Sequence, residues 1–509
     1  MSPRKNPPYL RVQLGSGSPE VMGLASTSLG QENLPEPLSS IHDVVCKWDW
    51  DGTQVVVRNC RLGFLPVYYF ASKDVFAVST SIEKLLQCGA SSELDDVAMA
   101  TLLRLGFVVG DDTVFKSIRM VPPDGEVRWC GGDLQVRAGY VFPRRQELSH
   151  SAAIEGYGEL FRQAMRRRVA KEVTFGLPLS GGRDSRHILL ELIELGVRPE
   201  KCFTNHDFPP YRTEDIRVGR LLAQRFELPH QVLGQPGSRL VAELRKNRAN
   251  AYCATENIWA VNLYRTIANY TPIVYEGTAG DVISGGSYLR QDHSRLYEEG
   301  RLEELSRHLV SEWFWRGSEE TLARVLTSDA IRRFSRSLAV ERITKELERH
   351  TSAANPLTSF YFWNRTRRVA APQPFSIARE AGVTAITPYL DHDVIDFLAA
   401  LPPDHFFDKT FHTKTIERMH PNFGDIPYAS KSDLPFVEGW LHYQRFLAEF
   451  VGYVAGRSCG RLVRKGPALR GALGLMLSAS PNLRMRMSWI APYTVLYMTQ
   501  LEKLCSKYE

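Results

Sequence analysis

The residues with the clearest chemical signature are SGGRDS at positions 180–185, between the apolar segment VTFGLPL and the helical pattern SRHILLELIELG. The adjacent glycines Gly181 and Gly182 let the backbone turn sharply and approach phosphate oxygens without interference from a Cβ atom. The free N–H groups of such a turn, with the positive end of the following helix, attract an anion. The segment therefore predicts a phosphate-binding turn between a strand and a helix.

Three side chains of the turn could assist. Ser180 and Ser185 add hydroxyl donors, and Asp184 supplies a carboxylate for Mg²⁺, a cation that prefers oxygen ligands. A capped glycine turn without a ligand is the alternative for a bare S-G-G, but the full S-G-G-x-D-S between strand and helix favours nucleotide binding. It is not a Walker A loop, because no G-K-[ST] follows.

This hexapeptide resembles the pyrophosphate-binding loop of the N-type ATP pyrophosphatases. Further segments follow in the order expected for the asparagine synthetase family, and the resemblance covers roughly residues 176–439. Members of that group cleave ATP between the α and β phosphates. The resemblance therefore implies an AMP- and pyrophosphate-forming ligase with ATP and Mg²⁺, which adenylates a carboxylate and couples it to a nitrogen nucleophile.

The resemblance also implies further site residues. Phe203 and Thr204 end a strand at the position that borders the adenine in the family. The segment IVYEGTAGDVISGG resembles the family's glycine-rich loop, so that Gly277 contacts the nucleotide and Asp281 is the second Mg²⁺ carboxylate, facing Asp184. Ligands bind at this edge of open α/β sheets.

Two lysines complete the implied site. The segment ITPYLDHDVIDFLAALPPD is similar to a conserved segment of the family and the helix after it, and HTKTIERM and YASKSDLPF resemble its two lysine segments. Lys414 and Lys431 would then reach the phosphates, where a cation stabilises the charge that develops on pyrophosphate and on the tetrahedral intermediate.

The chain departs from the family at two places. Ser2 stands where glutamine-dependent members carry a catalytic cysteine, and RLGFLPVYYF, which resembles a segment deep in the glutaminase domain, already occurs at residues 61–70. We therefore expect a truncated, inactive relic of that domain. In the acceptor pocket the family glutamate is replaced by Thr278, which cannot be a strong base; Glu276 and Glu256 are nearby in sequence and could be surface residues.

The substrate carboxylate should not be bound as aspartate is, because Thr384 and Ile386 replace the usual glutamate and arginine. The first hypothesis is an amide ligase for another substrate, as in lasso-peptide cyclases or β-lactam synthetases. The second is asparagine synthesis, with free ammonia or a partner glutaminase supplying the nitrogen, and the third is a catalytically silent nucleotide-binding scaffold. A separate partner that delivers ammonia or a peptide is therefore possible.

The elements that must position these residues follow from the hydrophobic pattern. Alternation around Asp51-Gly52 predicts a β-hairpin, VYYFASKDVFAVST a second strand pair, and residues 81–87 a helix. From residue 151 strands and helices alternate, which predicts a doubly wound parallel sheet of the adenine nucleotide α-hydrolase type. We expect a smaller α+β domain, similar to a degenerate N-terminal-nucleophile hydrolase, at 1–145, the ATP pyrophosphatase domain at 151–450, and a basic helical extension at 451–509.

Bulk properties exclude several function classes. The 509 residues carry 63 Lys+Arg and 57 Asp+Glu, a net charge of +6 that does not argue for nucleic acid. Eight cysteines lie scattered with no C-x-x-C pair, which favours reduced thiols in the cytoplasm. No signal peptide or apolar segment of membrane-spanning length is evident, so no membrane partner is expected. The basic stretch 457–486 is interpreted as a solvated linker before a last helix at 493–504.

Overall fold

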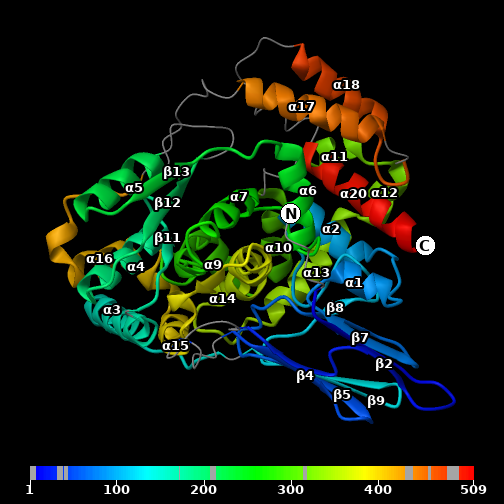
Figure 1. Cartoon of the computed structure of the whole chain (residues 1–509), viewed down its shortest axis with the longest axis horizontal. Coiled ribbons are helices and arrows are strands. Elements are labelled where there is room, and N and C mark those ends of the chain that lie inside the picture. The colour runs from blue at the N-terminus through cyan, green and yellow to red at the C-terminus, as the bar shows by residue number, and fades with distance from the viewer. Residues whose placement is uncertain are drawn as a thin grey trace.

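The computed structural model of the chain describes residues 7–30, 38, 44–140, 142–170, 172–206, 214–312, 318–429, 440–456, 460–477 and 492–509. Figure 1 shows three β-sheets, two in an N-terminal unit and one surrounded by helices. Among the described helices, none combines the length and the apolar character that crossing a membrane requires. The seven cysteines in the described residues are free thiols.

The N-terminal unit contains two antiparallel five-stranded sheets, in the orders β2-β1-β7-β6-β8 and β10-β9-β5-β4-β3. Their inward side chains include Trp48, Phe76 and Trp129, all at most 1% exposed. The strands are β1 (Tyr9–Gln13), β2 (Glu20–Gly23), β3 (Ser26–Leu29), β4 (Cys46–Trp50), β5 (Gln54–Asn59), β6 (Tyr68–Ala71), β7 (Val75–Ser79), β8 (Arg119–Met120), β9 (Glu126–Cys130) and β10 (Asp133–Arg137).

The predicted hairpins are confirmed. Strand β4 pairs with β5, with Trp50 opposite Val55, and β6 pairs with β7. The Asp51 carboxylate accepts hydrogen bonds from the backbone N–H of Thr53 at 2.8 Å and of Gln54 at 3.0 Å, while Gly52 adopts φ +99°. An aspartate that holds its own turn and a glycine in the left-handed region are what a tight turn requires.

Buried arginines join the N-terminal unit to the rest of the chain. The Arg367 guanidinium donates to the Gly63 carbonyl at 3.0 Å and to the Val121 carbonyl at 2.8 Å, and it pairs with Asp111 at 2.9 Å. Arg104 pairs with Glu319 across the same boundary at 2.7 Å. Because such charges are costly to bury unless they are paired and hydrogen-bonded, these contacts fix how the two units dock.

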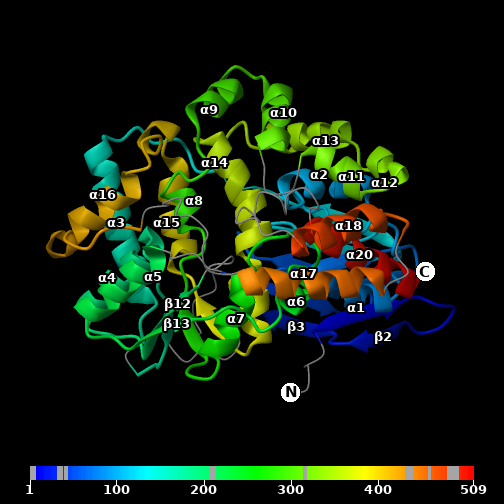
Figure 2. The same ribbon diagram turned by 90° about the horizontal axis from the view of Figure 1, so that it is seen from above.

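The third sheet is parallel, with strand order β13-β12-β11-β14-β15. Its central strand, β11 (Gly176–Pro178), is the predicted strand before the phosphate-binding turn, and the strand order reverses there. The other strands are β12 (Lys201–Asn205), β13 (His230–Leu233), β14 (Ile273–Tyr275) and β15 (Thr384–Ile386). In Figures 1 and 2, helices surround this sheet. The protein is thus an α/β protein with additional antiparallel sheets.

The helices predicted at residues 81–87 and after the 180–185 turn are present as α1 and α4. Ser81 caps α1, and Gly196, just beyond α4, adopts φ +75° as a helix-ending glycine does. The helices are α1 (Ile82–Gln87), α2 (Asp96–Leu105), α3 (His150–Arg167), α4 (Arg183–Glu194), α5 (Glu214–Arg225), α6 (Arg239–Ala249), α7 (Ile258–Ile267), α8 (Gly280–Ile283), α15 (His392–Ala400) and α16 (Phe411–Met419).

A helical layer between residues 291 and 378 packs beside the N-terminal unit (Figure 2). It includes two π-helical segments, η3 (Phe362–Ala370) and η4 (Gln373–Ala378). The α-helices of this layer are α9 (Gln291–Glu298), α10 (Leu302–Glu312), α11 (Glu319–Val325), α12 (Ser328–Arg333), α13 (Arg336–Glu348) and α14 (Pro356–Tyr361); short 3₁₀ turns follow at Pro388–Leu390, Pro403–His405 and Pro421–Phe423.

The C-terminal part consists of α17 (Trp440–Ala455), α18 (Lys465–Met476) and α20 (Pro492–Tyr508). Helix α17 runs across the expected domain boundary at residue 450. The interpretation of 457–486 as a linker is wrong for α18, whose Ala468, Ala472 and Leu475 are buried at helical spacing. The expected last helix at 493–504 is confirmed as α20.

Asp391 ties α15 to α3. Its carboxylate accepts a hydrogen bond from the backbone N–H of Asp393 at 3.0 Å, which caps α15. It also lies 2.5 Å from the buried Arg168 and 2.7 Å from Arg167. Although burial opposes ionisation, these arginines lower the pKa of Asp391. The ion pair and the cap together hold the segment that precedes α16.

We predict that Asp391→Ala lowers the free energy of unfolding by about 3–5 kcal/mol, because it removes a carboxylate that pairs with the buried Arg168. Urea unfolding followed by circular dichroism measures the loss. Asp393→Ala is the matched control: this neighbour pairs only with Arg167 and its side chain is 61% exposed, so the change should cost less than about 1 kcal/mol. Equal losses in the two variants would contradict the role given to Arg168.

Candidate active site

The turn at 180–185 joins the end of β11 to α4, as the sequence predicts (Figure 1). Gly182 is the N-cap residue of α4, with extended backbone and no side-chain cap. The Gly181 N–H donates to the Asp215 carboxylate at 2.8 Å, and the Gly182 N–H donates to the Ser180 hydroxyl at 3.1 Å. A phosphate could use these two amides once the Asp215 and Ser180 side chains rotate away.

Gly181 also has a packing role. A Cβ atom there would lie 2.5 Å from the Cβ of Ala429 and 2.8 Å from the Cβ of Val218. The Ala429 N–H donates to the Gly181 carbonyl at 2.9 Å. The Ser180 N–H donates to the Ser185 hydroxyl at 3.0 Å, which closes the turn. The turn is therefore internally bonded and leaves no space for a side chain at Gly181.

The second glycine-containing loop packs directly on Asp184. A Cβ atom on Gly280 would lie 2.7 Å from the Asp184 Cγ, and one on Gly277 would lie 2.8 Å from the Asp184 Cβ. Strands β11 and β14 are parallel neighbours, so the loops that follow them meet at one edge of the sheet. The structure thus brings Asp184 and the Asp281 loop together, and both glycines are needed for this approach.

Three carboxylates gather at this edge. Burial, and then the charge of the neighbouring Asp281, raises the pKa of the Asp184 carboxyl well above its ordinary value, and Glu276 adds to the effect. Asp281 is exposed in the first turn of α8, and its backbone N–H bonds to the Asp184 carboxylate. Oxygen ligands that repel one another in this way form a donor set that fits Mg²⁺, because a divalent cation removes the repulsion.

The predicted acceptor residue Thr278 is buried, and its hydroxyl donates to the Glu276 carboxylate. Glu276 is only 7% exposed, and burial raises its pKa. The structure therefore gives Thr278 the role of a hydrogen-bond donor that orients Glu276. The position of Glu276 in the sequence did not show whether its side chain is buried or exposed. The apolar segment Ile273–Tyr275 directly before it was the available signal that it is buried.

Phe203 and Thr204 fill packing positions. The Phe203 side chain is 1% exposed in a small core with Ile267 and Val274. The Thr204 hydroxyl donates to the Leu179 carbonyl and lies 2.8 Å from His230 Nε2. Only the backbone of these two residues is left to border a nucleotide, and the predicted contact remains a prediction.

Of the two predicted lysines, the structure describes Lys414 but not Lys431. Lys414 lies on α16, where the preceding Thr413 accepts a hydrogen bond from Arg183 of the turn. The Lys414 ammonium pairs with Asp408 at 3.1 Å, and its side chain is 44% exposed. Lys431 lies outside the described residues. The structure thus brings α16 to the turn, while the roles of both lysines remain predictions.

A buried histidine that the sequence did not single out lies beneath Asp184. His412 Nδ1 is 3.4 Å from the Asp184 carboxylate and 3.0 Å from the Ser284 hydroxyl. Burial lowers the pKa of His412 to about 3, and the charge of Arg183 adds to this effect. His412 is therefore a neutral group that links α16 to the carboxylate edge.

Arg365 and Tyr288, which the sequence did not single out, interact with the charge of Asp281 and lie beside Glu256, which it did. Arg365, on the π-helical segment η3, pairs with Glu256 at 2.7 Å, and its guanidinium lies 4.5 Å from the centre of the Tyr288 ring. Glu256, Tyr288 and Asp281 together raise the pKa of Arg365 despite its burial. Because π-helical segments often occur at functional sites, η3 is a candidate wall of the substrate pocket.

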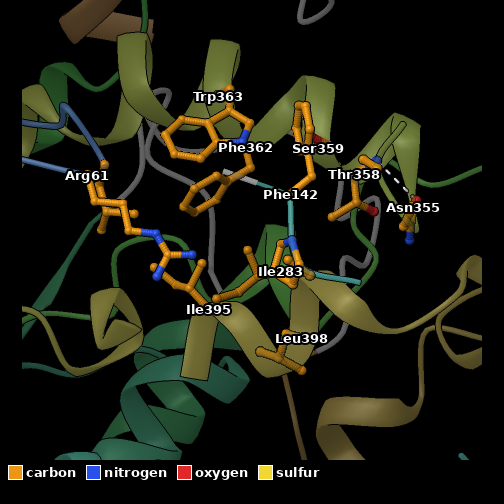
Figure 3. Close-up of a pocket in the computed structure, with 14 residues that line it drawn as sticks. Arg61, Phe142, Ile283, Asn355, Thr358, Ser359, Phe362, Trp363, Ile395 and Leu398 are labelled. Carbon is orange, nitrogen blue, oxygen red and sulfur yellow. Dashed lines mark hydrogen bonds between the residues drawn. The ribbon is translucent and has the colours of Figure 1, made fainter. Parts of the chain in front are cut away.

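A narrow apolar cavity of about 30 Å³ lies behind α8 (Figure 3). Ile283 of α8, Ile395 of α15 and Phe362 of η3 line it, and Arg61 and Phe142 of the N-terminal unit close it. The cavity does not include any residue of the phosphate-binding turn. Its place at the seam of the two units puts it next to the Asp281 helix, not over the carboxylates.

The chain is similar to a curated protein and to part of a solved structure. "Asparagine synthetase [glutamine-hydrolyzing] 2" of Bacillus subtilis (strain 168) is 23% identical over 433 residues, covering 77% of this chain and 55% of the relative. The chain thus spans about half the length of this relative. Glutamine phosphoribosylpyrophosphate amidotransferase from B. subtilis, complexed with ADP and GMP, shares 11% identity over 38% of this chain and 48% of that chain, with a TM-score of 0.15. So low a score supports no conclusion about the fold.

The family comparison covers the site itself. Residues 156–422 match the asparagine synthase family, which is more than half of the 509 residues. The matched segment contains the 180–185 turn, the Asp281 loop and α16, the elements that meet at the carboxyl edge of the parallel sheet. The chain belongs to the asparagine synthase family.

Proposed function

We propose that the protein is an AMP-forming amide ligase that acts on a carboxylate other than aspartate. The observation that carries the proposal is the meeting of Asp184 and Asp281 beside the 180–185 turn, in a chain of the asparagine synthase family. The strand order, which reverses at β11, supports a doubly wound sheet of the adenine nucleotide α-hydrolase type, and ligands bind such sheets where the order reverses.

The proposed chemistry has two steps. A substrate carboxylate oxygen attacks the α-phosphorus of ATP, the bond to the α–β bridging oxygen breaks, and pyrophosphate leaves. An amine then attacks the acyl carbon, loses its proton to a base, and displaces AMP. Asp184 and Asp281 would hold Mg²⁺, which neutralises phosphate charge when bound. The turn amides would bind the pyrophosphate, and Lys414 and Lys431 would face it.

The acceptor side favours Glu276 over Thr278 as the base. Glu276 is a buried carboxylate with a raised pKa, which suits a group that takes a proton near neutral pH. Thr278 donates its hydroxyl to this carboxylate and would keep it aimed. We therefore assign Thr278 the role of a positioning residue.

The residues of β15 bear on which substrate carboxylate the site can bind. Thr384 and Ile386 lie in β15, where Ile386 is buried and its carbonyl accepts a hydrogen bond from the Glu276 N–H at 2.8 Å. A buried isoleucine offers no charge to a second carboxylate, which disfavours aspartate. Arg365, which interacts with the charge of Asp281, is a cation that could meet an anionic group of a small-molecule or peptide substrate.

The N-terminal unit is proposed to be a truncated glutaminase-like domain kept as a packing partner. Arg367 and Arg104 bind it to the rest of the chain through buried contacts, which support a fixed structural role. Accordingly, the purified protein should release no ammonia from glutamine.

Asparagine synthesis is the second candidate, because the Bacillus subtilis relative is named a glutamine-hydrolysing asparagine synthetase. A silent nucleotide-binding scaffold is a third, and the grouping of Asp184, Asp281 and Glu276 counts against it. Incubation with ATP, Mg²⁺ and ammonia, with aspartate or a panel of peptide and amino-acid carboxylates, separates the three. Asparagine from aspartate identifies the second candidate, and AMP with pyrophosphate from another carboxylate supports the first. ADP with phosphate contradicts both.

Lys431 offers a test of the second step. We predict that Lys431→Met lowers amide formation about a hundredfold with little change in ATP affinity, because an ammonium that faces charge growing on the acyl carbonyl acts mainly in the transition state. Lys431→Arg should also fail, since a planar guanidinium does not replace a compact ammonium. Steady-state kinetics measure both. Unchanged turnover in Lys431→Met would remove this lysine from the site.

A further inference from the structure

Three buried side chains of types that can bind a metal ion lie close together, away from the sheet edge that carries Asp184 and Asp281 (the nucleotide edge). His187 and Glu191 lie one helical turn apart on α4, so they share one face of that helix. His420 follows the last residue of α16 and faces them. One ligand atom from each residue lies within 4.8 Å of the others, and the three residues are 0%, 0% and 2% exposed.

Each of the three side chains has one buried polar atom without a hydrogen-bond partner among the described residues. His187 Nε2, Glu191 Oε1 and His420 Nε2 are buried atoms that make no hydrogen bond to any described residue. His420 Nε2 lies 3.0 Å from Glu191 Oε1, yet the two atoms do not form a hydrogen bond of acceptable geometry. Leaving three such atoms unsatisfied in a protein interior is costly, so the site calls for a group that accepts all three lone pairs.

The outer atoms of the same residues are already held. His187 Nδ1 lies 3.2 Å from His412 Nε2, and His420 Nδ1 lies 2.7 Å from Glu194. Arg162 lies 3.4 Å from the second oxygen of Glu191. Partners of this kind fix the orientation of metal-binding imidazoles and carboxylates, and they leave the inner atoms free to coordinate.

The ligand set indicates which cation would bind. Two imidazole nitrogens and one carboxylate oxygen are a known zinc-binding combination, whereas Mg²⁺ and Ca²⁺ prefer oxygen ligands alone. We propose that His187, Glu191 and His420 bind a Zn²⁺ ion that joins α4 to α16, with a water molecule as the fourth ligand of a tetrahedral site. The site is distinct from the Mg²⁺ carboxylates and does not depend on the proposed function.

Such an ion would fix the position of α16 relative to the 180–185 turn. Helix α4 begins at the phosphate-binding turn, and α16 carries Thr413, which bonds to Arg183 of that turn. His412 of α16 contacts both His187 and Asp184. A metal ion between the middle of α4 and the C-terminal end of α16 would therefore fix the angle at which α16 meets the sheet edge that carries Asp184.

The test uses the full chain without an affinity tag, stripped with a chelator and reloaded with Zn²⁺ alone. Elemental analysis after gel filtration should find one Zn²⁺ per chain, and Co²⁺ should give the visible absorption of a tetrahedral site. The Tm should rise by about 3 °C or more with bound Zn²⁺. His420→Gln and Glu191→Gln should lose at least nine-tenths of the metal while circular dichroism still shows cooperative unfolding.

Two variants are matched controls. His405→Gln removes a histidine from another histidine pair, at 3.3 Å from His150, and should keep the full metal content. Asp281→Asn alters the nucleotide edge and should keep it as well. The proposal is overturned by wild-type protein that neither retains Zn²⁺ nor gives the tetrahedral Co²⁺ spectrum, a result that needs no variant to fold. Loss of the metal in Asp281→Asn would assign the ion to the nucleotide edge and would also overturn it.

Discussion

Replacing Asp281 by asparagine is expected to slow carboxylate-dependent pyrophosphate release about a thousandfold or more. The exposed Asp281 carboxylate lies beside Asp184 at the edge that would face the phosphates, and a neutral amide is a poor ligand for Mg²⁺. Loss of several kcal/mol of charge stabilisation corresponds to that decrease. Asp184→Asn should be as severe, because the two carboxylates would hold the same cation.

The matched control for this prediction is Asp292→Asn, an exposed aspartate that pairs with Arg290 at 2.5 Å on the nearby surface. It should keep the wild-type rate in a coupled pyrophosphate assay. A rate in Asp281→Asn within tenfold of the wild-type rate would contradict the metal assignment.

Asp184 should affect the stability of the fold in the opposite direction from its effect on activity. Because the pKa of Asp184 is raised in the folded protein, its charged form destabilises the fold. This penalty is absent below the ordinary aspartate pKa of 3.8, grows as the pH rises toward the raised pKa, and is complete above it. Asp184→Asn in metal-free buffer should therefore unfold at a urea concentration no lower than wild type at pH 7. A variant that is inactive because it is unfolded would fail this check.

Replacing Glu276 by glutamine should lower amide formation about a thousandfold, the range expected when a general base is removed. Carboxylate-dependent exchange of pyrophosphate into ATP should change much less, because the first step needs no base at the acceptor. Thr278→Ala removes only the hydroxyl that orients Glu276 and should cost about tenfold or less. A Thr278→Ala enzyme as slow as Glu276→Gln would mean that the base is misassigned, and so would loss of the exchange reaction in Glu276→Gln.

Local patterns predicted the elements that carry the site. The glycine pair and the apolar strand before it predicted the turn between β11 and α4, and alternation around Asp51-Gly52 predicted the β4–β5 hairpin. The spacing of Ala468, Ala472 and Leu475 was a helical signal, but the basic residues spread over 457–486 led to the linker interpretation of that segment. In the segment that forms α18, the helical spacing of apolar residues is therefore a better predictor of secondary structure than the content of basic residues.

The residues that sequence reasoning missed depend on contacts across long separations. His412 reaches His187 over 225 positions, and Arg365 reaches Glu256 over 109. No local pattern specifies which distant histidine or arginine a fold brings to a strand edge. At Phe203 the order of segments predicts a nucleotide contact; the fold buries the side chain in a core, so only the backbone is left to make that contact. Sequence order predicted the location of the edge, and packing decided which side chains face it.

Oxygen-18 transfer tests the central claim, the adenylation of a carboxylate, most directly. A substrate that supports AMP release is prepared with ¹⁸O in both carboxylate oxygens and turned over with ATP and the amine acceptor, and the products are analysed by mass spectrometry. Attack of the carboxylate on the α-phosphorus predicts one ¹⁸O in each AMP and none in pyrophosphate. Unlabelled AMP, or label in inorganic phosphate released with ADP, would contradict the account.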